Sequence, residues 1–336
     1  MHRIIGGEFA IDSRLLSKNE KSIELQYSSG RSALYSILMH IKAKNGKILL
    51  PSYLCDSITR TVIDAGWMYE FYQVDEFLQL TIDDSFSALL KKYDAVLLIN
   101  YFGVVDLKEE ISKIRKENTE IYIIEDDVQA FYAMNNSLAD WSFTSLRKWF
   151  PCPDGAILHS NDSTKIEPCI KLENKWSQYK LAGNLLKEQS DYIDDSIMLS
   201  LLDKGEELLD DGYLSPCSEA SRLIFANLDL DCIAHQRKKN AYILHCELEK
   251  LGIRHLYSGK IVPLFIPIFV ENRDELRRAF FAEQIFAPKH WPRISDELNG
   301  TNPLYDTELS LICDQRYGAE DMLKQIGVIK NFLKMG

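Results

Sequence analysis

The sequence predicts an α/β protein with a large domain, an α/β/α sandwich built on a mostly parallel mixed sheet, and a smaller C-terminal α+β domain. Two observations support this prediction. Short apolar runs typical of buried strands alternate with helical patterns as far as residue 160. Beyond residue 218, a long helical pattern leads into a second, shorter region of strands and helices. We place the large domain at residues 1–235 and the small domain at residues 236–336.

The composition favours a globular protein and argues against several classes of partner. The 336 residues are 46% hydrophobic and 26% charged, which is enough for a large core. The net charge is −11 and no basic block is present, so nucleic acid is not expected as a partner. No apolar run reaches the roughly 18–20 residues that span a bilayer. The N-terminus lacks the apolar region of a signal peptide, and we expect no membrane partner.

The cysteines suggest a reducing environment. There are seven, scattered along the chain, and none forms a C-x-x-C pair. Neither a disulfide framework nor a metal site is predicted from them. A cytoplasmic location is the simplest expectation.

The first half of the chain carries the pattern of a parallel sheet. From Gly30, apolar residues recur at helical spacing as far as Ile41. Strands are predicted at residues 47–51, 68–74, 95–99, 121–124, 139–145 and 156–159. Helical patterns, including residues 57–65 and 107–116, separate the first four of these strands. Strands joined by helices form βαβ units, so most of the strands should be parallel.

The second half is expected to be more helical. Within residues 160–215 an acidic group is expected to form a solvated helix face: Glu206, Glu207, Asp210 and Asp211. A helical pattern then continues from Ser218 to Leu248. After it we expect a strand at 261–270, a helix at 274–281, a short strand that begins at Ile312 and a terminal helix at 321–333.

Polar residues follow several of the predicted strands. In open α/β sheets, ligands bind beyond the carboxyl ends of the strands. The residues predicted at these ends are Ser52, Tyr53, Asn100, Tyr101, Asp126 and Gln129. This edge of the sheet is therefore the expected site.

Three features near this edge are together the parts needed to hold pyridoxal phosphate. Lys148 follows a strand and lies between apolar and aromatic neighbours, an unusual place for a solvating charge. Asp126 ends an apolar strand, and side-chain alternation directs it away from Glu125 and Asp127. Ser29-Gly30-Arg31-Ser32 opens a helix, where free N–H groups suit a phosphate. Taken singly, the helix start also fits an ordinary N-cap, and the acidic triplet also fits a cap of the following turn.

Five motifs in this part of the chain carry a family resemblance. They are Ser-Gly-Arg-Ser-Ala-Leu from Ser29, Leu-Leu-Pro-Ser-Tyr from Leu49, Asn-Tyr-Phe-Gly from Asn100, Glu-Asp-Asp-Val-Gln-Ala from Glu125 and Ser-Phe-Thr-Ser-Leu-Arg-Lys from Ser142. In order and spacing the set resembles the DegT/DnrJ/EryC1/StrS family, fold-type-I pyridoxal-phosphate enzymes that are mostly sugar aminotransferases. The resemblance covers residues 25–160 and is looser from Arg237 onward.

The resemblance implies a role for each matching position. Lys148 takes the place of the lysine that forms a Schiff base with the cofactor. Asp126 matches the aspartate that pairs with the pyridine nitrogen, and Gln129 the glutamine near the ring hydroxyl. Gly30 and Arg31 match the turn whose amides hold the phosphate. Ser142 and Ser145 are both candidates for a further phosphate contact, and the spacing does not decide between them.

The sequence departs from the family pattern in three places. Tyr53 is the nearest candidate for the aromatic residue that stacks on the ring, while Cys55 falls at the nominal position. The glycine-rich loop after the lysine is replaced by residues 153–156, Pro-Asp-Gly-Ala. In the region of the usual Asn-x-Arg motif the chain has residues 218–222, Ser-Glu-Ala-Ser-Arg.

The resemblance implies a homodimeric aminotransferase that moves an amino group, from glutamate, to a nucleotide-linked keto-sugar. Asn100, Tyr101 and His290 are candidate substrate contacts. Synthesis of polysaccharide or antibiotic sugars would both fit. Two alternatives stay open: a pyridoxal-phosphate lyase or dehydratase, and a non-catalytic member that binds the cofactor or a sugar nucleotide. Lysine at position 148 argues against the dehydratase route, since dehydratase relatives carry histidine there.

Overall fold

A computed structural model describes residues 5–7, 9, 25–80, 82–161, 164–188, 194–257, 259–293 and 302–335. The large unit is built on a six-stranded sheet in the order β3-β2-β4-β5-β6-β7. All neighbours in it are parallel except β6 and β7. The strands are β2 (Lys47–Pro51), β3 (Met68–Tyr72), β4 (Ala95–Ile99), β5 (Tyr122–Asp126), β6 (Trp141–Ser145) and β7 (Ala156–Ser160). The predicted mostly parallel mixed sheet is confirmed.

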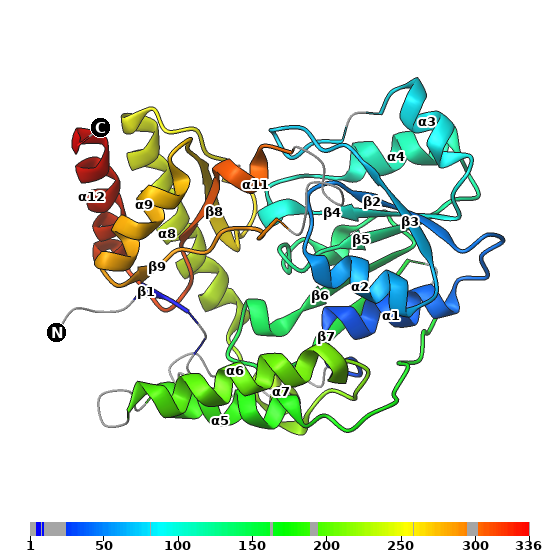
Figure 1. The fold of residues 1–336 in the computed structure, drawn as a ribbon, viewed down its shortest axis with the longest axis horizontal. Helices are drawn as coiled ribbons and strands as arrows, with labels where there is room; N and C mark the ends of the chain where they lie inside the picture. The colour runs from blue at the N-terminus through cyan, green and yellow to red at the C-terminus, as the bar shows by residue number, and fades with distance from the viewer. Residues whose placement is uncertain are drawn as a thin grey trace.

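Helices cover both faces of this sheet. Figure 1 shows α1 and α2 on one side and α3 and α4 on the other. Their bounds are α1 (Gly30–His40), α2 (Asp56–Asp64), α3 (Asp84–Leu90) and α4 (Lys108–Glu117). The β4 strand is buried along its whole length, as expected for a strand with helices on both faces. Short 3₁₀ turns follow the strands that build the site: η2 (Tyr101–Gly103), η3 (Met134–Asn136) and η4 (Leu146–Lys148).

Two long helices pack as an antiparallel pair beside the large unit. These are α5 (Trp176–Glu188) and α6 (Asp195–Gly212), drawn in green along the lower edge of Figure 1. Their close approach depends on small residues, since a Cβ added to Gly183 would lie 2.5 Å from a Leu202 methyl group. This contact places α6 against the cavity described below.

The small unit has its own core and two short sheets. Its strands are β8 (Phe265–Phe269) antiparallel to β10 (Glu308–Ile312), and β9 (Ile285–Phe286) parallel to β1 (Ile5–Gly6). Its helices are α9 (Arg273–Ala282), α11 (Leu304–Thr307) and α12 (Ala319–Met335). Ile5 joins this core, although it comes from the start of the chain. A division at residue 235 would fall within α8 (Leu230–Leu251), and we keep it as a proposal.

Two predicted elements differ from the structure. The helical pattern from Ser218 is broken into α7 (Glu219–Ala226) and α8, because the Asp229 side chain accepts the N–H of Cys232 and caps a new helix. The strand near Ile312 ends there instead of beginning there: β10 covers residues 308–312 and is buried throughout. Among the described residues, no helix has the length and apolar character needed to cross a bilayer.

Arg237 of α8 connects the two units. Its side chain is fully buried and lies above the Trp149 ring, 4.7 Å from the centroid. It donates to the carbonyl oxygens of Leu264 at 3.1 Å, Pro263 at 3.3 Å and Trp149 at 3.3 Å. Trp149 follows Lys148 directly, so this contact fixes the backbone next to the lysine.

We expect Arg237→Met to lower the free energy of unfolding by about 3 kcal/mol, because the buried carbonyl oxygens of Pro263 and Leu264 lose their guanidinium donor. Urea unfolding measures the change. Arg278→Met is the control, since the Arg278 side chain is 76% exposed and its loss should cost under about 0.5 kcal/mol. Equal effects of the two substitutions would contradict the role given to Arg237.

Candidate functional site

A cavity of about 670 Å³ lies at the carboxyl ends of the parallel strands, and both units contribute to its wall. Seven of the eleven site residues proposed from the sequence line it: Gly30, Arg31, Asp126, Gln129, Ser145, Lys148 and His290. Four others are not among its lining residues: Tyr53, Asn100, Tyr101 and Ser142. The predicted edge of the sheet therefore does carry a large cavity.

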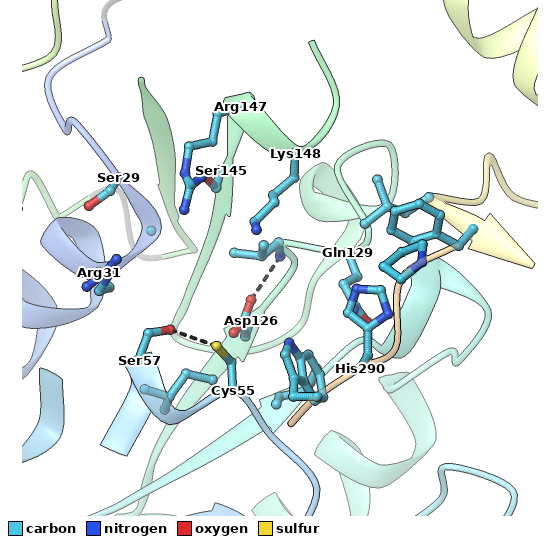
Figure 2. A pocket seen from close by; sticks show the side chains of 18 of the residues that line it. Ser29, Arg31, Cys55, Ser57, Asp126, Gln129, Ser145, Arg147, Lys148 and His290 are labelled. Atoms are coloured by element: carbon cyan, nitrogen blue, oxygen red, sulfur yellow. Dashed lines mark hydrogen bonds between the residues drawn. The ribbon is translucent and has the colours of Figure 1, made fainter. Parts of the chain in front are cut away.

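Lys148 reaches this cavity from the turn after β6. The strand ends at Ser145, and η4 turns the chain so that the lysine side chain extends into the cavity toward Asp126, as Figure 2 shows. Side-chain alternation along β6 separates the two candidate serines. Ser145 lines the cavity, whereas the Ser142 hydroxyl lies 3.5 Å from the Met134 carbonyl oxygen. The geometry thus favours Ser145 as the serine available to a ligand.

Asp126 is the buried acid of the cavity. Its Oδ1 accepts the backbone N–H of Val128 at 2.9 Å. Burial raises the pKa of Asp126 to about 7, although the Val128 N–H lowers it. A carboxyl group in this position favours a cationic ligand, because a nearby positive charge restores the ionised form.

The neighbouring acids lie on the opposite side of β5. Asn100 donates from Nδ2 to Asp127 Oδ1 at 3.2 Å and to Glu125 Oε1 at 3.5 Å. Burial raises the pKa of both acids, and each carboxyl group also affects the other. Asn100 is therefore part of a buried network behind the strand, which is why the structure does not bring it to the cavity.

The first turn of α1 forms another part of the wall. Ser29 caps the helix by accepting the N–H of Ser32, and among the described residues no acceptor lies on the N–H groups of Gly30 and Arg31. A side chain in place of Gly30 would meet Val128 at 3.2 Å and Phe143 at 3.4 Å, so this turn packs tightly on β6. Free N–H groups at a helix start attract anions.

Hydrogen bonds and ring contacts with neighbouring residues fix the side chains of Gln129 and His290. The Gln129 Oε1 accepts the backbone N–H of Phe102 at 2.9 Å, which leaves the amide NH₂ as the donor side of the group. The His290 Nδ1 lies 2.9 Å from the Ser310 hydroxyl, and its ring packs on Phe102 and Phe265. Both orientations are therefore set by the protein.

The two tyrosines proposed from the sequence lie behind the wall. Tyr53 is fully buried and packs against Tyr101, Tyr305 and Trp291. The Tyr101 hydroxyl donates to the Tyr53 carbonyl oxygen at 2.5 Å. Cys55, at the start of α2, lines the cavity in place of Tyr53, and Ser57 Oγ donates to its Sγ at 3.1 Å.

Two acids of α6 were not expected in the site. Glu206 and Asp210, predicted to face solvent, are 43% and 55% exposed, and both also line the cavity. Glu206 pairs with Arg147 and with Lys180, both at 2.7 Å, and Asp210 pairs with Arg31 at 2.9 Å. Burial acts to raise the pKa of Glu206, but the charges of Arg147 and Lys180 lower it to about 2. The four-residue spacing of these acids places them on one helix face, yet only the fold shows which cations they meet.

The small unit contributes a further cation that the sequence reasoning left unassigned. Arg316 lines the cavity and binds Asp314 with two hydrogen bonds, at 2.9 Å to Oδ1 and 2.7 Å to Oδ2. Burial acts to raise the pKa of Asp314, but the Arg316 guanidinium holds it below its usual value. Arginines from both units thus face one cavity.

Comparison with solved structures identifies the fold. PseC of Helicobacter pylori, an aminotransferase involved in the biosynthesis of pseudoaminic acid, aligns with a TM-score of 0.69 and 15% identity over 99% of this chain and 100% of its own. A DegT DnrJ EryC1 StrS aminotransferase from Brucella abortus aligns with a TM-score of 0.61 and 18% identity over 92% of this chain and 85% of its own. DesI, solved with its TDP-sugar product, aligns with a TM-score of 0.66 and 16% identity over 91% of this chain and 79% of its own.

These alignments confirm the predicted fold, that of fold-type-I aminotransferase structures of the DegT/DnrJ/EryC1/StrS group. At such identities the likeness is one of fold. No family model matches the sequence, and no curated protein matches it.

The pKa of Asp126 predicts a pH-dependent effect of Asp126→Asn on the cofactor-free protein. Because the folded-state pKa of about 7 lies above the unfolded value of about 3.9, the Asp126 carboxyl group lowers the stability of the fold as the pH rises from about 4 to 7, and the full loss is present above pH 7. The Asn variant should be more stable than the parent at pH 8, by up to about 4 kcal/mol. The difference should shrink as the pH falls from 7 toward 4, since the proton that the carboxyl group takes up on folding is then bound at less cost.

Urea unfolding at pH 5 and pH 8 measures this difference. The matched control is Asp203→Asn, which removes an exposed carboxylate from α6. A stability difference for Asp126→Asn that is the same at both pH values would contradict the assignment of the raised pKa.

Proposed function

We propose that the protein is a pyridoxal-phosphate-dependent aminotransferase that transfers an amino group, from glutamate, to a nucleotide-linked keto-sugar. The observation that supports it most is that the Lys148 amine, the Asp126 carboxyl group and the free N–H groups of α1 line one cavity. The fold of the solved aminotransferases is the second support. The nature of the donor and acceptor comes from the family resemblance.

The residues present fit pyridoxal phosphate. The group carries an aldehyde, a basic ring nitrogen and a phosphate, and the cavity offers an amine, a buried acid and a helix start. The burial that raises the pKa of Asp126 to about 7 is offset when a protonated ring nitrogen lies against it. In this proposal Lys148 holds the cofactor covalently, Asp126 binds the ring nitrogen and Gln129 the ring hydroxyl. The first turn of α1 and the Ser145 hydroxyl hold the phosphate.

When bound, the cofactor supplies an electron sink for the carbon that gains or loses the amino group. The protein must orient the donor and move a proton. Lys148 Nζ would take a proton from the donor Cα in the first half-reaction and would deliver a proton to the acceptor carbon in the second. Asp126 holds the positive charge of the ring nitrogen in place during this exchange. Arg147, next to the lysine, is paired with Glu206 at 2.7 Å.

The charges of the cavity suit anionic substrates. Arg31, Arg147 and Arg316 all line it, and each is held in position by a carboxylate. Glutamate has carboxylates and a nucleotide sugar has phosphates, both of which arginine binds well. Of the substrate contacts expected from the sequence, His290 lies at the cavity and stays in the proposal.

We also propose a homodimer, as the family resemblance implies. Exposed apolar side chains on α6, Ile197 and Leu199, offer a surface for a second copy on the helix that also lines the cavity. Light scattering should give twice the chain mass of 38.7 kDa. A mass of one chain at micromolar concentration would contradict the dimer.

Covalent attachment tests the role of Lys148. Protein incubated with pyridoxal phosphate and reduced with borohydride should carry the label on the peptide that contains Lys148, detected by mass spectrometry. Lys148→Ala should abolish this label and the visible absorbance of the bound cofactor. Lys175→Ala is the control, because the Lys175 side chain is 70% exposed and is not among the residues that line the cavity. A Lys148→Ala protein that kept the absorbance would refute the assignment.

Two half-reactions test the transfer itself. Glutamate should release 2-oxoglutarate and leave the cofactor in its amino form, which a nucleotide keto-sugar should then convert back. A panel of such sugars, followed by absorbance, identifies the acceptor. Release of ammonia without the amino form would instead support a lyase. Bound cofactor without any half-reaction would support a non-catalytic binding protein.

A further inference from the structure

Two imidazoles and a carboxylate converge at the end of α8, outside the cavity. His245 and Glu249 lie one turn apart on this helix, and His255 follows it. Gly252, in the left-handed conformation that favours glycine, ends the helix and turns the chain back. One ligand atom from each of the three residues lies within 4.8 Å of the other two. We propose that these residues form a binding site for a divalent transition-metal ion, with Zn²⁺ as the preferred ion.

The protein fixes the orientation of His255. Its side chain is only 3% exposed, and Nδ1 lies 2.8 Å from the Ile253 carbonyl oxygen. A carbonyl oxygen only accepts, so Nδ1 carries the proton and Nε2 carries the lone pair. Metal-binding histidines are oriented in this way, with the second ring nitrogen donating to a carbonyl or carboxylate oxygen. The lone pair of His255 Nε2 faces the other two residues.

The distances suit a tetrahedral ion. From His255 Nε2, the His245 Nδ1 lies at 2.8 Å and the Glu249 Oε1 at 3.6 Å. Tetrahedral Zn²⁺, with bonds of about 2.0–2.2 Å, holds adjacent ligand atoms about 3.3 Å apart. The two distances bracket this value, so small side-chain rotations would admit the ion. The His245 ring is held by contact with Tyr257, with ring centroids 4.7 Å apart.

The alternative explanation of the contact between His245 and His255 is a hydrogen bond with no metal ion. In the metal-free state His245 Nδ1 donates its proton to His255 Nε2. Metal binding requires that proton to leave Nδ1, and the other nitrogen of the neutral His245 ring can take it. The exchange therefore consumes no proton overall. A histidine–histidine hydrogen bond does not require a third group. The carboxylate of Glu249 beside the pair therefore favours a metal site over a hydrogen bond alone.

The ligand set selects the class of ion. Two imidazoles and one carboxylate suit Zn²⁺ or similar transition metals, whereas Mg²⁺ and Ca²⁺ prefer oxygen ligands. Glu249 is 65% exposed, so an ion can enter from solvent. Within the described part of the chain, no other histidine, cysteine or acid joins this group, and water would complete the coordination. An ion here would tie α8 to the segment that pairs with β8, where His255 bridges Ile268.

Metal binding to untagged, chelator-treated protein tests the site. Co²⁺ should bind with the strong visible bands of tetrahedral coordination, and Zn²⁺ should displace it at one ion per chain and raise the melting temperature. His245→Ala and His255→Ala should each weaken Zn²⁺ binding by at least about 100-fold, and Glu249→Gln by at least about tenfold. His235→Ala is the control, an exposed histidine on the same helix that should leave binding unchanged.

The result that overturns the proposal is the absence of Zn²⁺ binding, or binding that survives loss of either His245 or His255. An equal loss in His235→Ala would also overturn it, because the ion would then lie elsewhere on the helix. Circular dichroism checks that each variant is folded. If the alanine variants do not fold, Glu249→Gln decides the question, since it keeps both imidazoles and the shape of the side chain. The outcome is independent of pyridoxal phosphate and of any transferase activity.

Discussion

The candidate site is arranged around one buried carboxyl group, that of Asp126, whose ionised form is unfavourable in the free protein. Asp126 lies at the end of β5, a strand that is buried from Ile123 onward, and burial raises the pKa of Asp126 to about 7. A protein that keeps an acid in such a place gains little stability from it, since desolvation disfavours the charge. A cationic ligand next to Asp126 makes the ionised form of the carboxyl group favourable again. The same burial that is unfavourable in the free protein then becomes a source of affinity for a protonated ring nitrogen.

The other residues of the cavity position a ligand for its contact with Asp126. The turn after β6 brings Lys148 to face Asp126, and Arg237 holds the backbone beside the lysine through the Trp149 carbonyl oxygen. The helix start at Gly30 offers N–H groups at another part of the wall. Each of these parts comes from a different element, so the site depends on the packing of both units. A shift of the small unit would move Arg316 and His290 away from the strand ends.

Local patterns in the sequence predicted the strands and the direction of Asp126, because alternation along a strand is fixed by backbone geometry. They did not decide between Ser142 and Ser145, since the family spacing fitted neither serine fully and the strand boundary was uncertain. They placed Glu206 and Asp210 on a solvated helix face, and both side chains are about half exposed, but they did not show that this face lines the cavity. These acids look solvated within α6, and their partners Arg147 and Arg31 lie far away in the sequence. The helix break before α8 was missed because Asp229 caps within an otherwise continuous apolar pattern.

The most direct test of the central claim is the protonation state of the ring nitrogen in the loaded protein. Nitrogen-15 NMR of protein that carries pyridoxal phosphate labelled at that atom reports it. Our account predicts a protonated nitrogen between pH 6 and pH 9 in the parent protein and loss of that proton in the Asp126→Asn variant. A neutral nitrogen in the parent, or a signal that the substitution leaves unchanged, would contradict it.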